Sequence, residues 1–145
     1  MANSVCEVLV TEKQLNRPIG DFDPESGAVV DFFGVVRRLE NAREIEGIEY
    51  EAHLAMAENQ LQHISEAAVE KFSLRKTIVH HRIGYVRAGE PSLMIRVAAE
   101  RRNAALDASK WIIDELKKKV PIWKQPRFKK EDQRTGSLIS TVATK

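Results

Sequence analysis

The chain has 145 residues, of which 43% are hydrophobic and 30% are charged, and its formal net charge is +2. This composition excludes wholesale disorder, and the length favours a single domain over residues 1–145. The lone cysteine, Cys6, excludes an intrachain disulfide, and no apolar run approaches the roughly 18 residues of a membrane span. We therefore expect a cytoplasmic protein without a membrane segment.

The first half of the chain carries mostly strand signals. Residues 5–11 and 28–36 are rich in apolar and β-branched side chains, which predicts two strands on either side of a Pro- and Gly-containing loop at 16–27. Because 28–36 is almost continuously apolar, we expect a central strand there, with a bulge at Gly34. A strand over 45–51 should pair with it as a hairpin with a long, exposed tip.

The second half of the chain alternates between helix and strand signals. Apolar residues recur at steps of three and four over 54–72, which predicts an amphipathic helix, and strands are expected at 76–86 and 92–99. Asn103 is the expected N-cap of a second helix. Pro121 should end that helix, because proline lacks a backbone N–H and disfavours helical geometry in the preceding residue.

The second helix and the tail complete the predicted fold. From about residue 127 the chain is polar and charged, with a short strand expected at 138–142, and this tail is expected either to be flexible or to complete a site. The resulting element order, β-ββ-α-ββ-α, predicts an α+β fold on a largely antiparallel sheet. The apolar stripe expected along the second helix consists of Leu106, Ile113, Leu116 and Val120, flanked by Trp111 or Ile112.

Lysines gather where the second helix should end. Lys117 lies in the last predicted turn and Lys124 lies just after the proline, so the two ammonium groups can converge on one cationic corner. A helix C-terminus favours cations, and two cations held close together also favour an anion. The alternative is a surface ladder of Asp107, Lys110, Asp114 and Lys117, with Trp123 packed into the core.

Two arginine pairs lie at the ends of predicted elements. Arg37 and Arg38 follow the apolar strand, and Arg101 and Arg102 precede the second helix. Arginine binds phosphate or carboxylate with fixed bidentate geometry, whereas lysine is a point charge that can also act as a general acid. Together, these residue types indicate a site that binds an anion.

Other common catalytic patterns are missing from the sequence. His80 and His81 are neighbours on a predicted strand and should face opposite sides, so we expect no metal site. There is no Gly-rich phosphate loop, and Cys6 has no recognisable motif around it. The chain is therefore not expected to provide a nucleophilic thiol of its own.

Six stretches of the chain stand out by their order and spacing: GAVVDFFGVVR at 27–37, IEYEA at 48–52, MAE at 56–58, HRIG at 81–84, IDELK at 113–117 and PIWK at 121–124. Together they resemble one family, the large, catalytic subunit of molybdopterin synthase. Single stretches are weakly specific, but the ordered set is specific and spans most of residues 27–125. The resemblance implies an α/β-hammerhead-type fold.

The resemblance also implies a function and partners. It implies a sulfurtransferase of molybdenum cofactor synthesis, in which a central homodimer binds a small ubiquitin-like subunit at each end to form a heterotetramer. The C-terminal Gly-Gly thiocarboxylate of the small subunit brings the sulfur. The substrate is cyclic pyranopterin monophosphate (precursor Z), the product is molybdopterin, and no cofactor, metal or nucleic acid is expected.

The resemblance assigns site residues by position. Lys117 and Lys124 would be catalytic: one would polarise the thiocarboxylate carbonyl or stabilise the developing oxyanion, and the other would position phosphate or protonate the leaving oxygen. Which lysine performs which step is left open. The expected substrate-binding residues are Val35, Val36, Arg37, Arg101, Arg102, Gln125 and Pro126.

Three positions depart from the family pattern. Arg101 stands where the family has histidine, and an arginine stays charged, so it can bind but not transfer a proton. Pro126 stands where the family has an acidic residue that could hold Lys124, and Leu106 replaces phenylalanine. A non-catalytic relative that binds the small subunit is therefore the alternative function. A basic patch for nucleic acid is a third, since Trp123 and Phe128 lie near the lysines.

Overall fold

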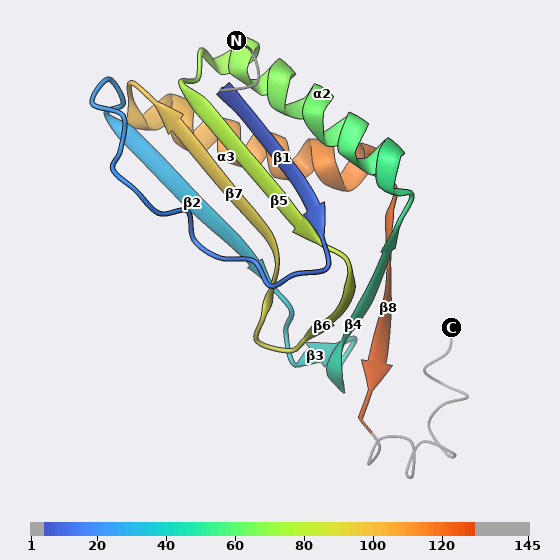
Figure 1. The fold of residues 1–145 in the computed structure, drawn as a ribbon. Coiled ribbons are helices and arrows are strands. Elements are labelled where there is room, and N and C mark those ends of the chain that lie inside the picture. The colour runs from blue at the N-terminus through green and yellow to red at the C-terminus, as the bar shows by residue number, and fades with distance from the viewer. Residues whose placement is uncertain (1–4, 130–145) are drawn as a thin grey trace.

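The computed structural model describes residues 5–129, which form two β-sheets with two helices packed on one of them (Figure 1). One sheet has the strand order β1-β5-β7-β2, and within it only β1 and β5 run parallel. The predicted α+β fold on a largely antiparallel sheet is therefore confirmed. The strands of this sheet are β1 (Cys6–Thr11), β2 (Ala28–Val35), β5 (Lys76–Arg82) and β7 (Pro91–Ala99).

The second sheet lies at one end of the first and is built around β4 (Figure 1). β4 pairs with β3, with β6 and, along most of its length, with β8. A small core of buried residues, including Val36 and Ile45, joins this sheet to the end of β2. The strands of this sheet are β3 (Leu39–Glu40), β4 (Arg43–Ala52), β6 (Gly84–Arg87) and β8 (Ile122–Phe128).

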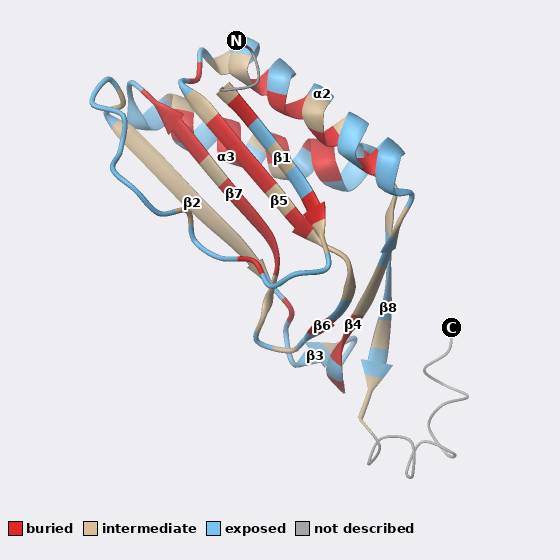
Figure 2. Ribbon diagram, viewed as in Figure 1, coloured by how far each residue is buried: buried red, intermediate tan, exposed pale blue. Residues whose placement is uncertain are grey.

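Helices α2 (Leu54–Phe72) and α3 (Arg102–Lys119) cover one face of the first sheet. α2 packs on β1 and β5, whereas α3 packs on β7 and β2. The bounds of α2 agree with the predicted helix, and its N-terminus is capped by the His53 side chain, whose Nδ1 accepts from the Met56 N–H at 3.3 Å. Figure 2 shows buried residues concentrated between these helices and the sheet. No helix among the described residues is long and apolar enough to cross a membrane.

The prediction of a central strand at 28–36 is wrong, because β2 lies at the edge of its sheet, whose internal strands are β5 and β7. The apolar run of β2 has another cause. Phe32 packs on the helix side, and Phe33 packs on the opposite side against Leu15, which belongs to the loop between β1 and β2. A strand that is covered on both faces has apolar side chains at successive positions, even when it lies at the edge of a sheet. The predicted bulge is confirmed by a register shift between Gly34 and Val35.

The predicted hairpin is also wrong, because β2 pairs with β7 while β4 belongs to the other sheet. The strand predicted at 76–86 divides into β5 and β6, which also lie in different sheets. Gly84 stands at this division with φ of +84°, a conformation that glycine adopts without steric cost. It allows the chain to leave one sheet and enter the next.

The second helix differs from its prediction at the start and along its buried face. Its N-cap is Arg101 rather than Asn103, and the Arg101 side chain makes no capping hydrogen bond. Leu106 is 54% exposed. Small residues let the helix approach the sheet and α2 closely, so the buried stripe is built largely on alanine. Its apolar members are Ala105, Ala108, Ile112 and Leu116.

The helix ends at Lys119, with Val120 as the C-cap, so the predicted stop before Pro121 is confirmed. Beyond the proline the chain forms strand β8, which extends past residue 127, where a polar tail was expected. Trp123 on this strand is 58% exposed, so it is not packed into the core. Pro126 is tolerated because, among residues 5–129, β8 pairs with β4 alone and therefore lies at a sheet edge. The strand predicted at 138–142 lies outside the described residues.

Candidate functional site

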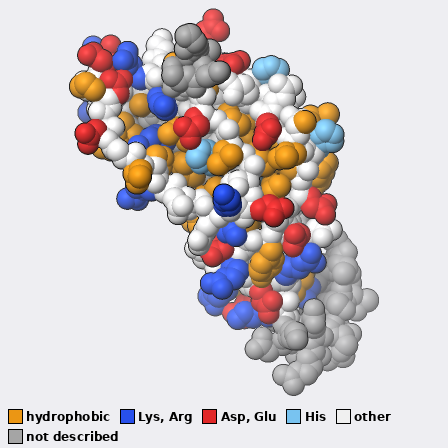
Figure 3. Space-filling model, in the orientation of Figure 1, with side chains coloured by type: hydrophobic (Ala, Val, Ile, Leu, Met, Phe, Trp, Pro, Cys, Tyr) orange, Lys and Arg blue, Asp and Glu red, His pale blue; other side chains and the backbone are white. Residues whose placement is uncertain are grey.

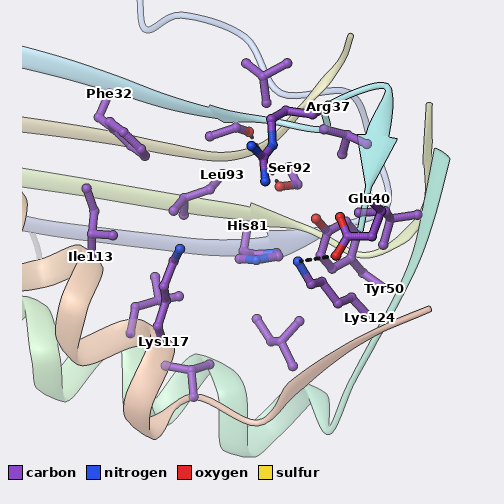
Figure 4. A pocket seen from close by; sticks show the side chains of 17 residues that line it. Phe32, Arg37, Glu40, Tyr50, His81, Ser92, Leu93, Ile113, Lys117 and Lys124 are labelled. Carbon is purple, nitrogen blue, oxygen red and sulfur yellow. Dashed lines mark hydrogen bonds and ion pairs between the residues drawn. The ribbon is translucent and has the colours of Figure 1, made fainter. Parts of the chain in front are cut away.

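A pocket of about 420 Å³ lies where the C-terminal ends of β2 and α3 meet β4 and β8 (Figure 4). Its walls come from both sheets and from the last turns of α3. Charged and polar side chains face an otherwise apolar lining. The polar and charged side chains that line it are Arg37, Glu40, Tyr50, His81, Ser92, Lys117 and Lys124.

Lys117 enters this pocket from the last turn of α3 (Figure 4). Its neighbours Lys118 and Lys119 instead pair with Glu115, at 3.2 and 2.7 Å between nitrogen and oxygen. Of the surface ladder expected from the sequence, one ion pair forms, between Lys110 and Asp114 at 2.8 Å. Within residues 5–129, Lys117 makes no ion pair or hydrogen bond, so its ammonium group is available to a ligand.

Lys124 enters the same pocket from β8, which its pairing with β4 holds in register opposite Tyr50. Its Nζ lies 3.9 Å from Oε2 of Glu40, a residue of β3. Figure 4 shows Lys117 and Lys124 reaching inward from opposite sides, with the His81 ring between them. The structure therefore brings the two lysines to one cationic corner.

Arg37 lies just beyond the bulged end of β2 and lines the pocket together with Val35 and Val36. It makes no ion pair or hydrogen bond within the described part of the chain. The adjacent Arg38 points elsewhere and pairs with Glu44 at 3.0 Å. One arginine of this pair is therefore free to bind an anion, and the other is structural.

Four of the predicted site residues do not line this pocket. Arg101 and Arg102 lie at the start of α3, and the rise of an α-helix places Arg102 about 22 Å from Lys117 along the axis. Gln125 follows Lys124 on β8, and alternation along a strand points it to the other face. Pro126 shares the face of Lys124 but pairs with Ile48 farther along the strand.

His81 is a pocket residue that the sequence did not assign. The residue is 6% exposed, and its Nδ1 lies 2.8 Å from the carbonyl oxygen of Arg82. Burial lowers the pKa of His81, which the hydrogen bond to the Arg82 carbonyl only partly offsets. His80 faces the opposite side of the sheet, as predicted, and lies 2.9 Å from Glu7. Alternation along the strand could have predicted that the His81 side chain lies on the helix-covered face of the sheet. Nothing in the sequence, however, indicated that a pocket lies on that face.

Tyr50 and Glu40 also contribute to the pocket and were not predicted. The Tyr50 ring lies edge-on to His81, with centroids 5.5 Å apart. Burial raises the pKa of Tyr50, a hydrogen bond with Ser92 opposes the shift, and the Glu40 charge adds to it. Glu40 supplies Lys124 with a carboxylate that Pro126 cannot provide. Its strand has two residues, too short for a sequence pattern to reveal.

The arrangement favours a small anionic ligand. Arg37, Lys117 and Lys124 surround a cavity with a single carboxylate, so they can bind phosphate or stabilise negative charge that develops during a reaction. On the face drawn in Figure 3, basic and acidic side chains are interspersed over the β3, β4 and β6 end, without a one-sign track for a long nucleic acid. Among residues 5–129, no group of three or more His, Cys, Asp or Glu side chains could hold a metal ion.

Comparison with known proteins identifies one family. The family model described as MoaE protein matches residues 7–119. A molybdopterin synthase catalytic subunit of Pyrococcus abyssi is 37% identical over 100 residues, which are 69% of this chain and 68% of the relative. One of Thermoplasma volcanium is 36% identical over 129 residues, 86% of this chain and 92% of the relative. The crystal structure of molybdopterin synthase from Staphylococcus aureus superposes with a TM-score of 0.72 at 30% identity, covering 86% of this chain and 91% of that one. The chain therefore belongs to the MoaE protein family, which includes the molybdopterin synthase catalytic subunits.

Proposed function

We propose that the chain is the catalytic subunit of a molybdopterin synthase, a sulfurtransferase. It would transfer sulfur from the thiocarboxylated C-terminus of a small ubiquitin-like subunit to precursor Z, building the dithiolene of molybdopterin. The observation that carries the proposal is the convergence of Arg37, Lys117 and Lys124 on one cavity. The substrate phosphate and the thiocarboxylate of the partner are both anions of the kind such a cavity favours.

The cations have distinct capacities. Arg37 has fixed bidentate geometry and no partner within residues 5–129, which suits it to hold the cyclic phosphate. Lys117 and Lys124 approach from opposite walls, so one can stabilise the oxyanion at the thiocarboxylate carbon while the other protonates the oxygen that leaves the substrate. Electrostatic groups of this kind typically contribute about 10²–10³ in rate each.

The sulfur must come from outside this chain. Cys6 is its lone cysteine and is buried on β1, where it does not line the pocket. A thiol that cannot reach the reacting atoms cannot relay sulfur. This placement supports a partner that carries the sulfur on its own C-terminus, and no resident cofactor is needed for the transfer.

Arg101 and Arg102 fit the proposal only if a second copy of the chain contributes them. They lie too far from Lys117 along α3 to reach the pocket of their own chain. In a two-fold dimer, each pocket can receive the start of α3 from the neighbouring copy. We therefore propose a homodimer with shared sites, with a small subunit bound at each end to give a cytoplasmic heterotetramer.

The function is tested by reconstitution with a thiocarboxylated small subunit and precursor Z, following the fluorescence of oxidised molybdopterin. Product that forms with the native chain and is lost with Lys117→Ala supports the enzyme. Lys118→Ala is the matched control, because Lys118 is adjacent in sequence but pairs with Glu115 outside the pocket. A stable complex with the small subunit that yields no product would instead support the non-catalytic alternative.

The shared site is tested by mixing two inactive variants, Lys117→Ala and Arg102→Ala. In a mixed dimer, one pocket contains both substitutions and the other contains neither. Statistical mixing should therefore restore about a quarter of the native activity, although each variant alone is inactive. A mixture that stays as inactive as its components would contradict a site shared between two copies.

A further inference from the structure

His81, the buried histidine at the pocket, has two ring nitrogens with different surroundings. Nδ1 lies 2.8 Å from the Arg82 carbonyl oxygen, which can only accept, so Nδ1 carries the hydrogen and donates. In the neutral ring, Nε2 then has a free lone pair. Nε2 has no hydrogen-bond partner within residues 5–129, and the ring faces the cavity (Figure 4).

Several elements around His81 present polar or charged groups to the same cavity, including β7, which contributes Ser92. Glu40 and Tyr50 face it from β3 and β4. The cations Arg37, Lys117 and Lys124 face it from the end of β2, from α3 and from β8. Burial lowers the pKa of His81 below its ordinary value of 6.5, and the hydrogen bond to the Arg82 carbonyl offsets this only in part. His81 is therefore neutral at neutral pH, and its free nitrogen can accept a proton.

The proposed sulfur transfer needs such an acceptor. Once the sulfur of the thiocarboxylate has bonded to a substrate carbon, the carrier is joined to the substrate through a thioester. Release of the carrier as a carboxylate requires a new oxygen on its acyl carbon, and water is the available source. Water that attacks this carbon must lose a proton, and Arg37 and the lysine that stabilises the oxyanion, which remain cations, cannot take it.

We propose that His81 is the general base that releases the small subunit after sulfur transfer, an inference that rests on the proposed function. The water oxygen bonds to the acyl carbon as Nε2 takes one water proton. The carbon–sulfur bond to the carrier breaks, and its electron pair stays on the sulfur as a thiolate of the product. The second water proton leaves to solvent when the new carboxylic acid of the carrier ionises. Glu40, the other candidate base of the pocket, is held in the ion pair with Lys124.

The experiment is a single turnover in heavy-oxygen water with the reconstituted complex, followed by intact mass. With the native chain, the released small subunit should gain one heavy oxygen atom at its C-terminus. With His81→Gln, we expect release to slow by about 10²–10⁴-fold, while sulfur transfer persists and the carrier accumulates as a covalent adduct with the small molecule. His80→Gln is the matched control, because His80 lies on the opposite face against Glu7.

Two results would overturn the inference: a released carboxylate without heavy oxygen, or release by His81→Gln within threefold of the native rate. A native complex that transfers no sulfur would refute the proposed function itself, which is a distinguishable outcome. The native chain also provides a test that does not depend on the variant folding. Because burial lowers the pKa of His81, the release rate of the native chain should fall only at a pH below 6.5, the ordinary value for histidine, and a fall whose midpoint lies at or above 6.5 would also overturn the inference.

Discussion

The pair between Glu40 and Lys124 gives a prediction whose size can be worked from the structure. Their charged atoms lie 3.9 Å apart, and the side chains are 23% and 55% exposed. Coulomb's law at an effective dielectric of 20 gives about 4 kcal/mol, but exposed pairs of this kind contribute about 1 kcal/mol or less once solvent screening and side-chain entropy are included. We use the smaller value because more than half of Lys124 is in water.

A loss of about 1 kcal/mol lowers the population of correctly placed Lys124 by about fivefold. We therefore expect Glu40→Gln to reduce the turnover number by about fivefold in the reconstituted assay, with little change in overall stability. Lys124→Ala should cost about 10²–10³, because it removes the charge itself. Glu44→Gln is the control, since Glu44 pairs with Arg38 and Lys129 outside the pocket.

A carboxylate placed elsewhere should rescue the Glu40 variant. Pro126 lies two residues after Lys124 on the same face of β8. Adding Pro126→Glu to Glu40→Gln should therefore recover most of the lost turnover. The reasoning is refuted if Glu40→Gln keeps the native turnover, or if it falls as low as Lys124→Ala, because neither outcome fits a group that acts by positioning the lysine.

Three further predictions concern folding. Asp31 accepts two hydrogen bonds from Arg96, at 2.6 and 2.8 Å, so Asp31→Asn should lower the free energy of unfolding by about 1.5–3 kcal/mol in urea titrations. The hydrogen bond from Arg96 lowers the pKa of Asp31, so the stability that this pair contributes is present above the ordinary pKa of 3.8 and is lost as the pH falls through the lowered pKa. If the native protein and Asp31→Asn were equally stable above pH 3.8, that result would contradict the prediction. Ile112 is fully buried, and Ile112→Ala should cost about 2–5 kcal/mol by the same titration, whereas a loss under 1 kcal/mol would show that the site collapses. Gly84→Ala should cost about 1–3 kcal/mol, because alanine is strained at φ of +84°, and unchanged thermal unfolding would refute that reading.

Local signals in the sequence were sufficient for parts of the fold and site. The stripe over 54–72 predicts α2 because helix periodicity is a property of one continuous segment. Pro121 predicts the end of α3 for the same reason, since its missing N–H acts on its own turn. The turn at Pro121 lies between Lys117 and Lys124 in the sequence. This is why the two lysines were expected to converge.

Other features depend on contacts between distant segments and could not be read locally. The run at 28–36 is apolar because a helix and a loop cover its two faces, and its composition does not reveal that, within residues 5–129, β7 is its one neighbour in the sheet. Glu40 and His81 reach the pocket from strands of two different sheets, and neither stands out within its own segment. The pairing of β8 with β4, which fixes the position of Lys124, likewise depends on tertiary structure.

The most direct test of the central claim follows the sulfur atom. A small subunit carrying labelled sulfur in its C-terminal thiocarboxylate is mixed with this chain and precursor Z for a single turnover, and the label is then located by mass. The account predicts that the label moves to the small-molecule product, that Lys117→Ala leaves it on the carrier, and that Lys118→Ala behaves as the native chain. Label that remains on the carrier with the native chain, although the complex forms, would contradict the account.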